Sequence, residues 1–262
     1  MRGTRDRLRE RWERSSAVLR APRVRIAMSG EEEARAAFRS FTARHPRFKV
    51  TGAKRWGVAL VPLPATFDEY LAGPSKEYLR RQRRRAEKAG YRYAVVTPRD
   101  RLPEILAINR SAPSRQGRAM ATSYVDPTRV AETFAARPSL HGILDAQGTL
   151  RAYADVSRFG DVIVFSRILG HADDLEHGPM YLLVSEVIRS WVERRGANAS
   201  PAWAMYDTFW GASSGLAYFK ERCGFRPYTV EWVWSDDAPP PARAGGSPLD
   251  GGGARTAGST DG

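Results

Sequence analysis

The segment of residues 76–92 carries the densest charge in the sequence, with eight Lys or Arg residues against two Glu. Arginine suits phosphate recognition because its planar guanidinium can donate two parallel hydrogen bonds to an oxyanion. Arg80, Arg84, Arg85 and Lys88 are therefore candidate contacts to the phosphates of a substrate or a nucleic acid. The alternative interpretation is a solvated basic helix face. No aromatic side chains interleave with these arginines in the sequence, so the pattern does not favour base stacking.

The other reactive side chains do not form a recognisable metal site or nucleophile. The four His residues are scattered, and His171 and His177 lie six apart in one loop, without a Cys pair beside them. Cys223 is the one cysteine, so no intrachain disulfide can form, and no His lies at a spacing that would activate it. We therefore expect no metal and no covalently bound cofactor, and we expect Cys223 to be a small helix residue.

The composition predicts a soluble cytoplasmic protein with a sizeable core. Of its 262 residues, 42% are hydrophobic, and seven Trp and ten Phe argue against wholesale disorder. No stretch approaches the roughly 20 apolar residues that span a bilayer, and no secretory signal is recognisable. The net charge of +13 is local, because residues 1–25 and 76–92 each contribute +6. An anionic partner would be attracted to these two places.

Charge and composition also predict three parts of the chain. Residues 1–22 form a basic N-terminal arm, and residues 23–235 form one domain. Residues 236–262 are predicted to be a disordered tail, because Gly and Pro make up 11 of the last 28 residues. Oligomeric state is left open.

Hydrophobic periodicity places the basic segment on a helix in the first half of the domain. The helix is expected between an N-cap at Ser75 and Gly90, and Asp100 is expected to cap a further helix. Residues 111–118 are predicted to be a loop. The other predicted elements here are a helix over 31–44, strands over 56–61 and 91–97, and a short helix near 127–136.

The second half has a more regular pattern, which indicates an α+β fold. A strand over 140–144 precedes a hairpin of strands 150–156 and 162–168. A helix then begins at Pro179 and ends at Gly196. A strand over 202–206, a helix over 215–223 and a strand over 227–234 complete the domain.

This order of elements resembles the core of the GNAT acyltransferases, most closely over residues 139–234. The run Leu-Ala-Tyr-Phe-Lys-Glu-Arg-Cys-Gly-Phe, residues 216–225, is similar to the end of the GNAT signature. Phe67-Asp-Glu-Tyr-Leu71, the basic helix that follows it and the Phe219-Lys220 pair resemble the FemAB-like branch, which includes aminoacyl-tRNA-dependent peptidyltransferases. The resemblance implies a GNAT-like fold, with a mixed, mostly antiparallel central sheet flanked by helices.

The resemblance also implies roles for individual residues. Lys220 occupies the position from which a lysine is thought to assist at the acyl centre, where its ammonium group can stabilise an oxyanion. A solvated helix lysine is the alternative. GNAT enzymes line the acceptor cleft from strand positions such as Asp155, Tyr206 and Asp207, so Asp155 or Asp207 is the candidate general base.

In GNAT enzymes the loop before the central helix holds the donor's pyrophosphate on backbone N–H groups. The corresponding loop here departs from the usual pattern, because Asp173, Asp174 and Glu176 would repel a pyrophosphate and Pro179 lacks an N–H. The candidate donor contacts implied by the resemblance are Arg167, Gly170, His171, Gly178, Met180 and Tyr181.

These observations lead to two hypotheses of different classes. The first is an N-acyltransferase that moves an acetyl or aminoacyl group to a small-molecule or peptide amine by direct attack. Acetyl-CoA is slightly favoured as donor, with aminoacyl-tRNA as the alternative. The second is a non-catalytic protein that binds nucleic acid on a GNAT-like scaffold.

Overall fold

The computed structural model describes residues 20–44, 52–115, 118–195, 200–209 and 212–236. The predicted arm at 1–22 and the predicted tail at 236–262 therefore lie almost entirely outside the described residues. None of the helices in the described part of the chain has the length and apolar character needed to cross a bilayer.

Eight strands form one mixed sheet in the order β1-β10-β2-β9-β8-β7-β6-β3. Neighbouring strands are antiparallel except for two parallel pairs, β1 with β10 and β8 with β9. A small hairpin of β4 and β5 stands apart from this sheet. The strands are β1 (Arg23–Met28), β2 (Val58–Pro62), β3 (Arg92–Val96), β4 (Ser114–Arg115), β5 (Arg118–Ala119), β6 (Leu140–Leu144), β7 (Leu150–Phe159), β8 (Val162–Gly170), β9 (Trp203–Thr208) and β10 (Arg226–Trp234).

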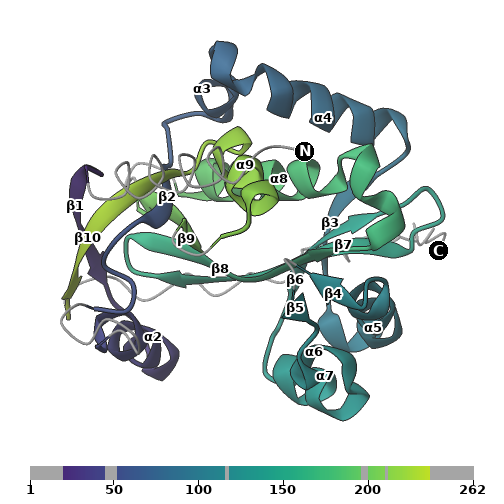
Figure 1. Cartoon of the computed structure of the whole chain (residues 1–262), viewed down its shortest axis with the longest axis horizontal. Helices are drawn as coiled ribbons and strands as arrows, with labels where there is room; N and C mark the ends of the chain where they lie inside the picture. Colours follow the sequence, from purple (N-terminus) through teal and green to yellow (C-terminus); the bar gives the residue numbers. More distant parts are fainter. Residues whose placement is uncertain (1–19, 45–51, 116–117, 196–199, 210–211, 237–262) are drawn as a thin grey trace, which may run out of the picture.

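Helices cover both faces of the sheet (Figure 1). The α-helices are α2 (Glu32–Thr42), α3 (Phe67–Leu71), α4 (Glu77–Lys88), α5 (Leu102–Arg110), α6 (Thr122–Val125), α7 (Pro127–Phe134), α8 (Pro179–Arg194) and α9 (Ser214–Arg222). The 3-10 helices are η1 (Pro74–Lys76), η2 (Pro98–Arg101) and η3 (Ala172–His177).

The two faces have separate cores. One face packs against α3, α4, α8 and α9, and its fully buried residues include Leu79, Leu183 and Phe225. The opposite face packs against α2 through residues such as Phe41 and against α5 and α7 through Ile105 and Phe134. The sheet is thus a layer between two groups of helices, which is the predicted α+β architecture.

The second half of the domain follows the predicted pattern closely. Helix α8 begins at Pro179, where the absent N–H costs nothing, and α9 is capped by Ser213 Oγ, which accepts from Leu216 N at 3.3 Å. Strands β7 and β8 extend beyond their predicted ends, to Phe159 and Gly170, because they pair along almost their whole length.

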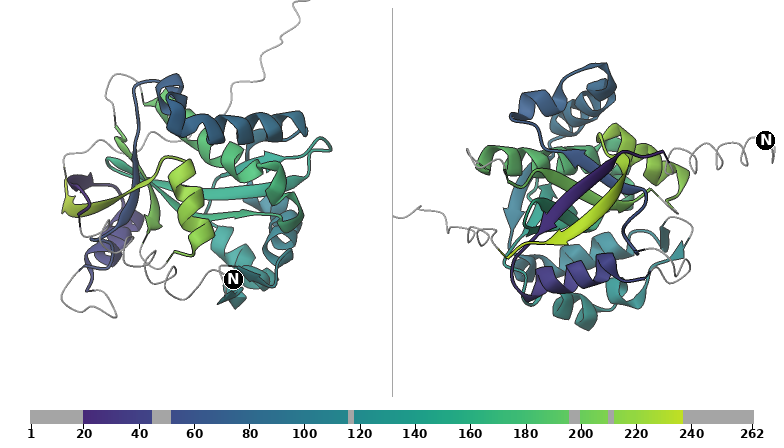
Figure 2. Two further views of the ribbon diagram at one scale, coloured as in Figure 1. Left: turned by 45° about the horizontal axis from the view of Figure 1, so that its top comes forward. Right: turned by 90° about the vertical axis from the view of Figure 1, so that its left-hand side faces the viewer.

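Several predictions for the first half were wrong in detail. Ser75 is not the N-cap of the basic helix, because it lies inside η1, and Asp100 likewise lies inside η2 without capping a helix. The loop predicted at 111–118 contains β4 and the start of β5. Strand β1 was not predicted, and it runs parallel to the end of β10 (Figure 2). The hydrophobic pattern did not indicate this strand, because Arg residues alternate at its start and only Ile26 and Met28 are buried.

Candidate functional site

A cleft opens where β8 and β9 separate. The two parallel strands pair only from Val162 to Val164 on β8, and no further register partners join β9 to the rest of β8. The cavity of about 1120 Å³ that lies there is lined by both strands and by residues of α2, α6 and α9. In an open sheet, the gap between two strands that part gives a ligand access to backbone groups and to side chains from several elements.

Lys220 is buried beside this cleft. Its side chain comes from α9 and is 0% exposed, and its Nζ donates to the Thr208 carbonyl oxygen at 2.8 Å. Nζ also lies 4.6 Å from the centroid of the Tyr206 ring. Burial lowers the pKa of Lys220 to about 8; the nearby Asp207 opposes this shift, and Lys54 adds a smaller lowering effect. The structure therefore places Lys220 in the cleft wall, unlike a solvated helix lysine.

An ion pair flanks Lys220 on the β9 side of the cleft. Asp207 lines the cleft and pairs with Lys54, which lies just before β2 in the chain. The backbone of Asp207 has a φ of 54°, an unfavourable value that aspartate tolerates better than most residues. Such backbone strain is common at functional sites. Here the strained residue, Asp207, directly precedes Thr208, whose carbonyl oxygen accepts the hydrogen bond from Lys220.

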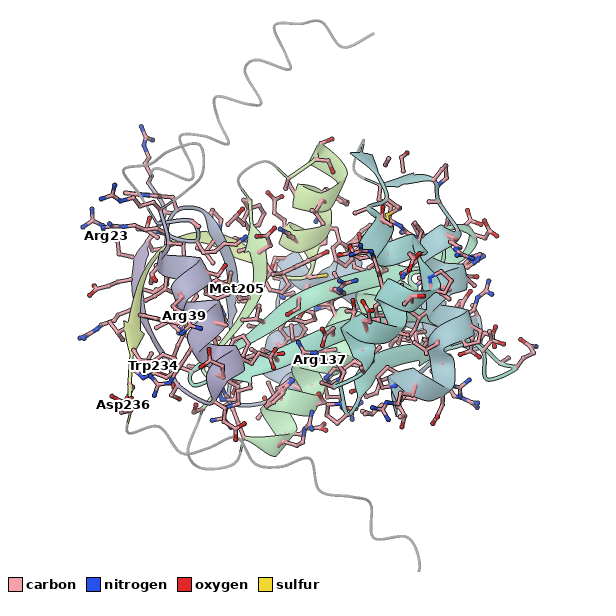
Figure 3. The ribbon with its side chains drawn as sticks, turned by 90° about the horizontal axis from the view of Figure 1, so that it is seen from below. Arg23, Arg39, Arg137, Met205, Trp234 and Asp236 are labelled. Atoms are coloured by element: carbon pink, nitrogen blue, oxygen red, sulfur yellow. The ribbon has the colours of Figure 1, made fainter. Side chains whose placement is uncertain are left out.

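Asp155, the other candidate base, is held in a different network. Its Oδ2 lies 3.4 Å from Arg137 Nε, and Arg137 also donates to both Glu33 carboxylate oxygens. Burial raises the pKa of Asp155, and the neighbouring Arg137 opposes that rise. Figure 3 views this face of the sheet, with Arg137 and the cleft residue Met205 both labelled. Asp155 is not among the residues that line the cleft, so Asp207 is the better placed carboxylate.

Helix α4 covers the loop that was predicted to hold the donor. Gly178 and Pro179 are buried, and a Cβ at Gly178 would lie 2.7 Å from the Gln82 carbonyl oxygen of α4. Met180 and Tyr181 are half-buried, and Tyr181 packs on Phe219 with ring centroids 4.8 Å apart.

One acidic residue of this loop, Asp174, is buried and forms hydrogen bonds within the protein. Asp174 accepts from Arg151 Nε at 2.6 Å and from the Tyr91 hydroxyl at 2.8 Å. Although burial raises the pKa of Asp174, these two hydrogen bonds hold its pKa below the ordinary value. A carbonyl oxygen over Gly178 and an anionic Asp174 do not fit a pyrophosphate, so this geometry does not favour Gly170, His171, Gly178, Met180 and Tyr181 as donor contacts. Their role stays a prediction.

The close approach of α4 to Gly178 leads to a stability prediction. We expect Gly178→Ala to lower the free energy of unfolding by about 1–3 kcal/mol, because its φ is 87° and the new methyl group would meet backbone. Gly215→Ala is the control, since a Cβ there meets nothing within 4 Å. Urea unfolding of both variants measures the difference, and equal midpoints would contradict the close packing of α4 on this loop.

The arginines of α4 separate into structural and exposed groups. Arg83 is buried and bonded to α8, and Arg80 donates to the carbonyl oxygens of Leu71 and Gly73. Arg84, Arg85 and Lys88 are exposed, so they remain candidate phosphate contacts.

No aromatic residue interleaves with these arginines in the sequence, but aromatic rings lie near Arg81 and Arg222 in three dimensions. The Tyr78 ring lies 5.8 Å from that of Tyr218 on α9, centroid to centroid. Arg81 lies over Tyr78, and Arg222 lies 4.7 Å from the Tyr218 ring centroid. Tyr218 belongs to a distant part of the chain, so a linear pattern cannot show that its ring lies beside the basic helix.

The sequence analysis missed several residues that line the cleft, of which three are important for its chemistry. Lys54, Arg115 and Tyr124 line the cleft together with the predicted Arg167, Asp207 and Lys220. They lie in loops or short elements without a motif. Among the described residues, no three His, Cys, Asp or Glu side chains gather as a metal site.

Comparison with solved structures identifies the fold. FemX aligns with a TM-score of 0.52 over 66% of this chain and 59% of its own, at 11% sequence identity. The chain has a GNAT-like fold. The order β7, β8, α8, β9, α9 and β10 in this GNAT-like domain is the one that the sequence predicted for residues 139–234.

Two further solved structures align less closely with the GNAT-like domain. They are L-PGS from Bacillus licheniformis (17% identity, TM-score 0.45, 65% of this chain and 57% of the other) and a tandem GNAT protein from the clavulanic acid biosynthesis pathway (14%, 0.43, 66% and 50%). The aligned region thus spans less than two thirds of each of these solved chains. No protein-family model matches the sequence, and no curated protein is significantly similar to it.

Proposed function

We propose that this GNAT-like protein is an N-acyltransferase that uses the β8–β9 cleft. The observation that supports the proposal most directly is the buried Lys220, whose Nζ lies at the wall of a large cavity beside the separated strands. A cation in a partly dehydrated site stabilises developing negative charge far more than it would in water.

The proposed reaction has no covalent enzyme intermediate. The neutral nitrogen of the acceptor attacks the donor carbonyl carbon, and the carbonyl oxygen becomes an oxyanion that the Lys220 ammonium stabilises. The bond to the leaving sulfur or oxygen then breaks as the carbonyl re-forms. The nitrogen loses its proton to water or Asp207, and the leaving group takes up a proton from solvent or from the Lys220 ammonium, which is then re-protonated.

The donor is an activated thioester or ester. Acetyl-CoA is the candidate that GNAT chemistry favours, whereas the covered loop at Gly178 and the exposed Arg84, Arg85 and Lys88 favour aminoacyl-tRNA. The test is to incubate the purified protein with each donor and a mixture of amines, and to detect acylated amines by mass spectrometry. Product from neither donor, with tRNA binding that falls steeply with salt, would favour the non-catalytic alternative.

The pH dependence of transfer tests the protonation state of Lys220. Because the ammonium form is required, the rate should fall as pH rises through about 8, the pKa of Lys220. Lys54 lowers this pKa and Asp207 raises it. We therefore expect Lys54→Gln to move the alkaline limb of the pH–rate profile to higher pH and Asp207→Asn to move it to lower pH. Shifts of the same sign in both variants would contradict this role.

A further inference from the structure

Arg167 lies on the part of β8 that has separated from β9. Register pairs Asp155 with Arg167 and Val156 with Phe165, so Ser166 is left as an extra residue between them. Such a bulge redirects the neighbouring side chains and is common beside active sites. Arg167 lines the cleft, and its guanidinium carbon lies 4.3 Å from the centroid of the Tyr124 ring.

The guanidinium of Arg167 is not fully bonded. Its Nη1 atom is buried and has no hydrogen-bond partner among the described residues. A buried donor without a partner costs about 1–3 kcal/mol, and a charged donor costs more. Stacking on Tyr124 holds the guanidinium plane in place but satisfies none of its N–H groups.

Arg115 shows the same feature from another wall of the cleft. Its Nη2 atom donates to the carbonyl oxygen of Gly170 at 3.0 Å and to Ser111 Oγ at 3.1 Å, which fixes the side chain. Its Nε atom is buried and, within the described part of the chain, has no hydrogen-bond partner. Two arginines that line one cavity therefore each hold an unused donor.

The carboxylates of the cleft do not neutralise these arginines. Glu33 is bonded to Arg137 and Ser157, and Asp207 is paired with Lys54. Neither Arg115 nor Arg167 forms an ion pair with any described carboxylate within the usual 4.0 Å limit. Asp155, which pairs in register with Arg167, attracts its charge but does not approach within ion-pair distance. Two arginine donor groups of the cleft wall are therefore left without a hydrogen-bond partner in the described part of the chain, and such donors recognise a carboxylate or a phosphate.

We propose that Arg167 and Arg115 form an anion-binding subsite that holds the acid group of the amine acceptor. The acceptor would then be an acidic amine, such as an amino acid, a peptide carboxylate or a phosphorylated amine. Arg167 on β8 and Lys220 beside β9 lie on opposite sides of the strand separation, so one end of the acceptor is anchored while its nitrogen faces the acyl centre. The identity of the ligand as an acceptor rests on the proposed acyl transfer, whereas the subsite itself does not.

Binding measured without an acyl donor tests the subsite. Calorimetry compares matched pairs of probes, L-alanine with L-alaninamide for a carboxylate and O-phosphoethanolamine with ethanolamine for a phosphate. We expect one acid of these pairs to bind at least about 10-fold more tightly than its neutral partner. Arg167→Gln and Arg115→Gln should each abolish that preference. Arg129→Gln, which removes an exposed arginine of α7, is the charge-matched control and should retain it.

The outcomes separate the subsite from the proposed function. Equal binding of acidic and neutral probes, including no binding of either at about 10 mM, would overturn the subsite, as would a preference that persists in Arg167→Gln. Circular dichroism and thermal unfolding establish that the variants are folded. Arg167→Lys keeps the positive charge but lacks the planar guanidinium that can donate two parallel hydrogen bonds. An acid preference that depends on both arginines, in a protein that transfers no acyl group, would support the subsite and reject the acyltransferase.

Discussion

Lys220→Ala is expected to lower kcat about 100-fold to 1000-fold, the loss that follows removal of one preorganised donor from an oxyanion site. The substitution removes the ammonium that Thr208 and Tyr206 hold at the cleft wall, while the acceptor subsite on β8 remains. The effect should therefore appear in kcat, with little change in the KM of the acceptor. Steady-state kinetics over a range of acceptor concentrations measure both quantities.

Lys76 provides a matched control for this experiment. Burial also lowers the pKa of Lys76 to about 8, and its Nζ also donates to a backbone carbonyl, that of Cys223, at 3.0 Å. Lys76 does not line the cleft, however, so Lys76→Ala should change stability and leave kcat within about 2-fold. Lys220→Arg is a second variant that keeps the positive charge. If Lys220→Ala and Lys76→Ala lose the same fraction of activity, Lys220 has no special role at the acyl centre.

The contrast between these two lysines shows what sequence reasoning could establish. Elements with strong local signals were predicted with good bounds, such as α8 after Pro179 and the strand at Leu140–Leu144. The motif around Phe219-Lys220 directed attention to Lys220, which the structure places in the cleft wall. Neither pattern could show that Lys220 would be buried, because its partners Tyr206 and Thr208 belong to another element.

The parts that were not predicted depend on contacts distant in sequence. Strand β1 became a strand because β10 offers it a parallel partner, not because its own residues alternate clearly. Arg115 enters the cleft because Gly170 and Ser111 fix it there. Tertiary contacts of this kind fix the position of some arginines and not of others, and composition alone cannot show which.

Arg83 is the clearest case, because it is a buried structural residue within the basic segment. Its Nη1 donates to Ser185 Oγ and its Nη2 pairs with Glu186 Oε1, each at 2.5 Å, and only 7% of the residue is exposed. These bonds join α4 to α8. The interpretation of the segment as a row of phosphate contacts therefore does not extend to Arg83.

Arg83→Ala is accordingly expected to lower the free energy of unfolding by about 3 kcal/mol, since it leaves the mostly buried Glu186 with only the longer contact of 3.9 Å to Arg189. Arg84→Ala, one position along on the exposed face, should change it by no more than about 0.5 kcal/mol. Urea unfolding measures both. The double variant Arg83→Met with Glu186→Gln should recover much of the loss, because no unpaired charge then remains at the interface. If Arg83→Ala and Arg84→Ala lower the free energy of unfolding equally, the ion pair with Glu186 does not stabilise the packing of α4 on α8. Arg83 would then be as available to bind phosphate as Arg84.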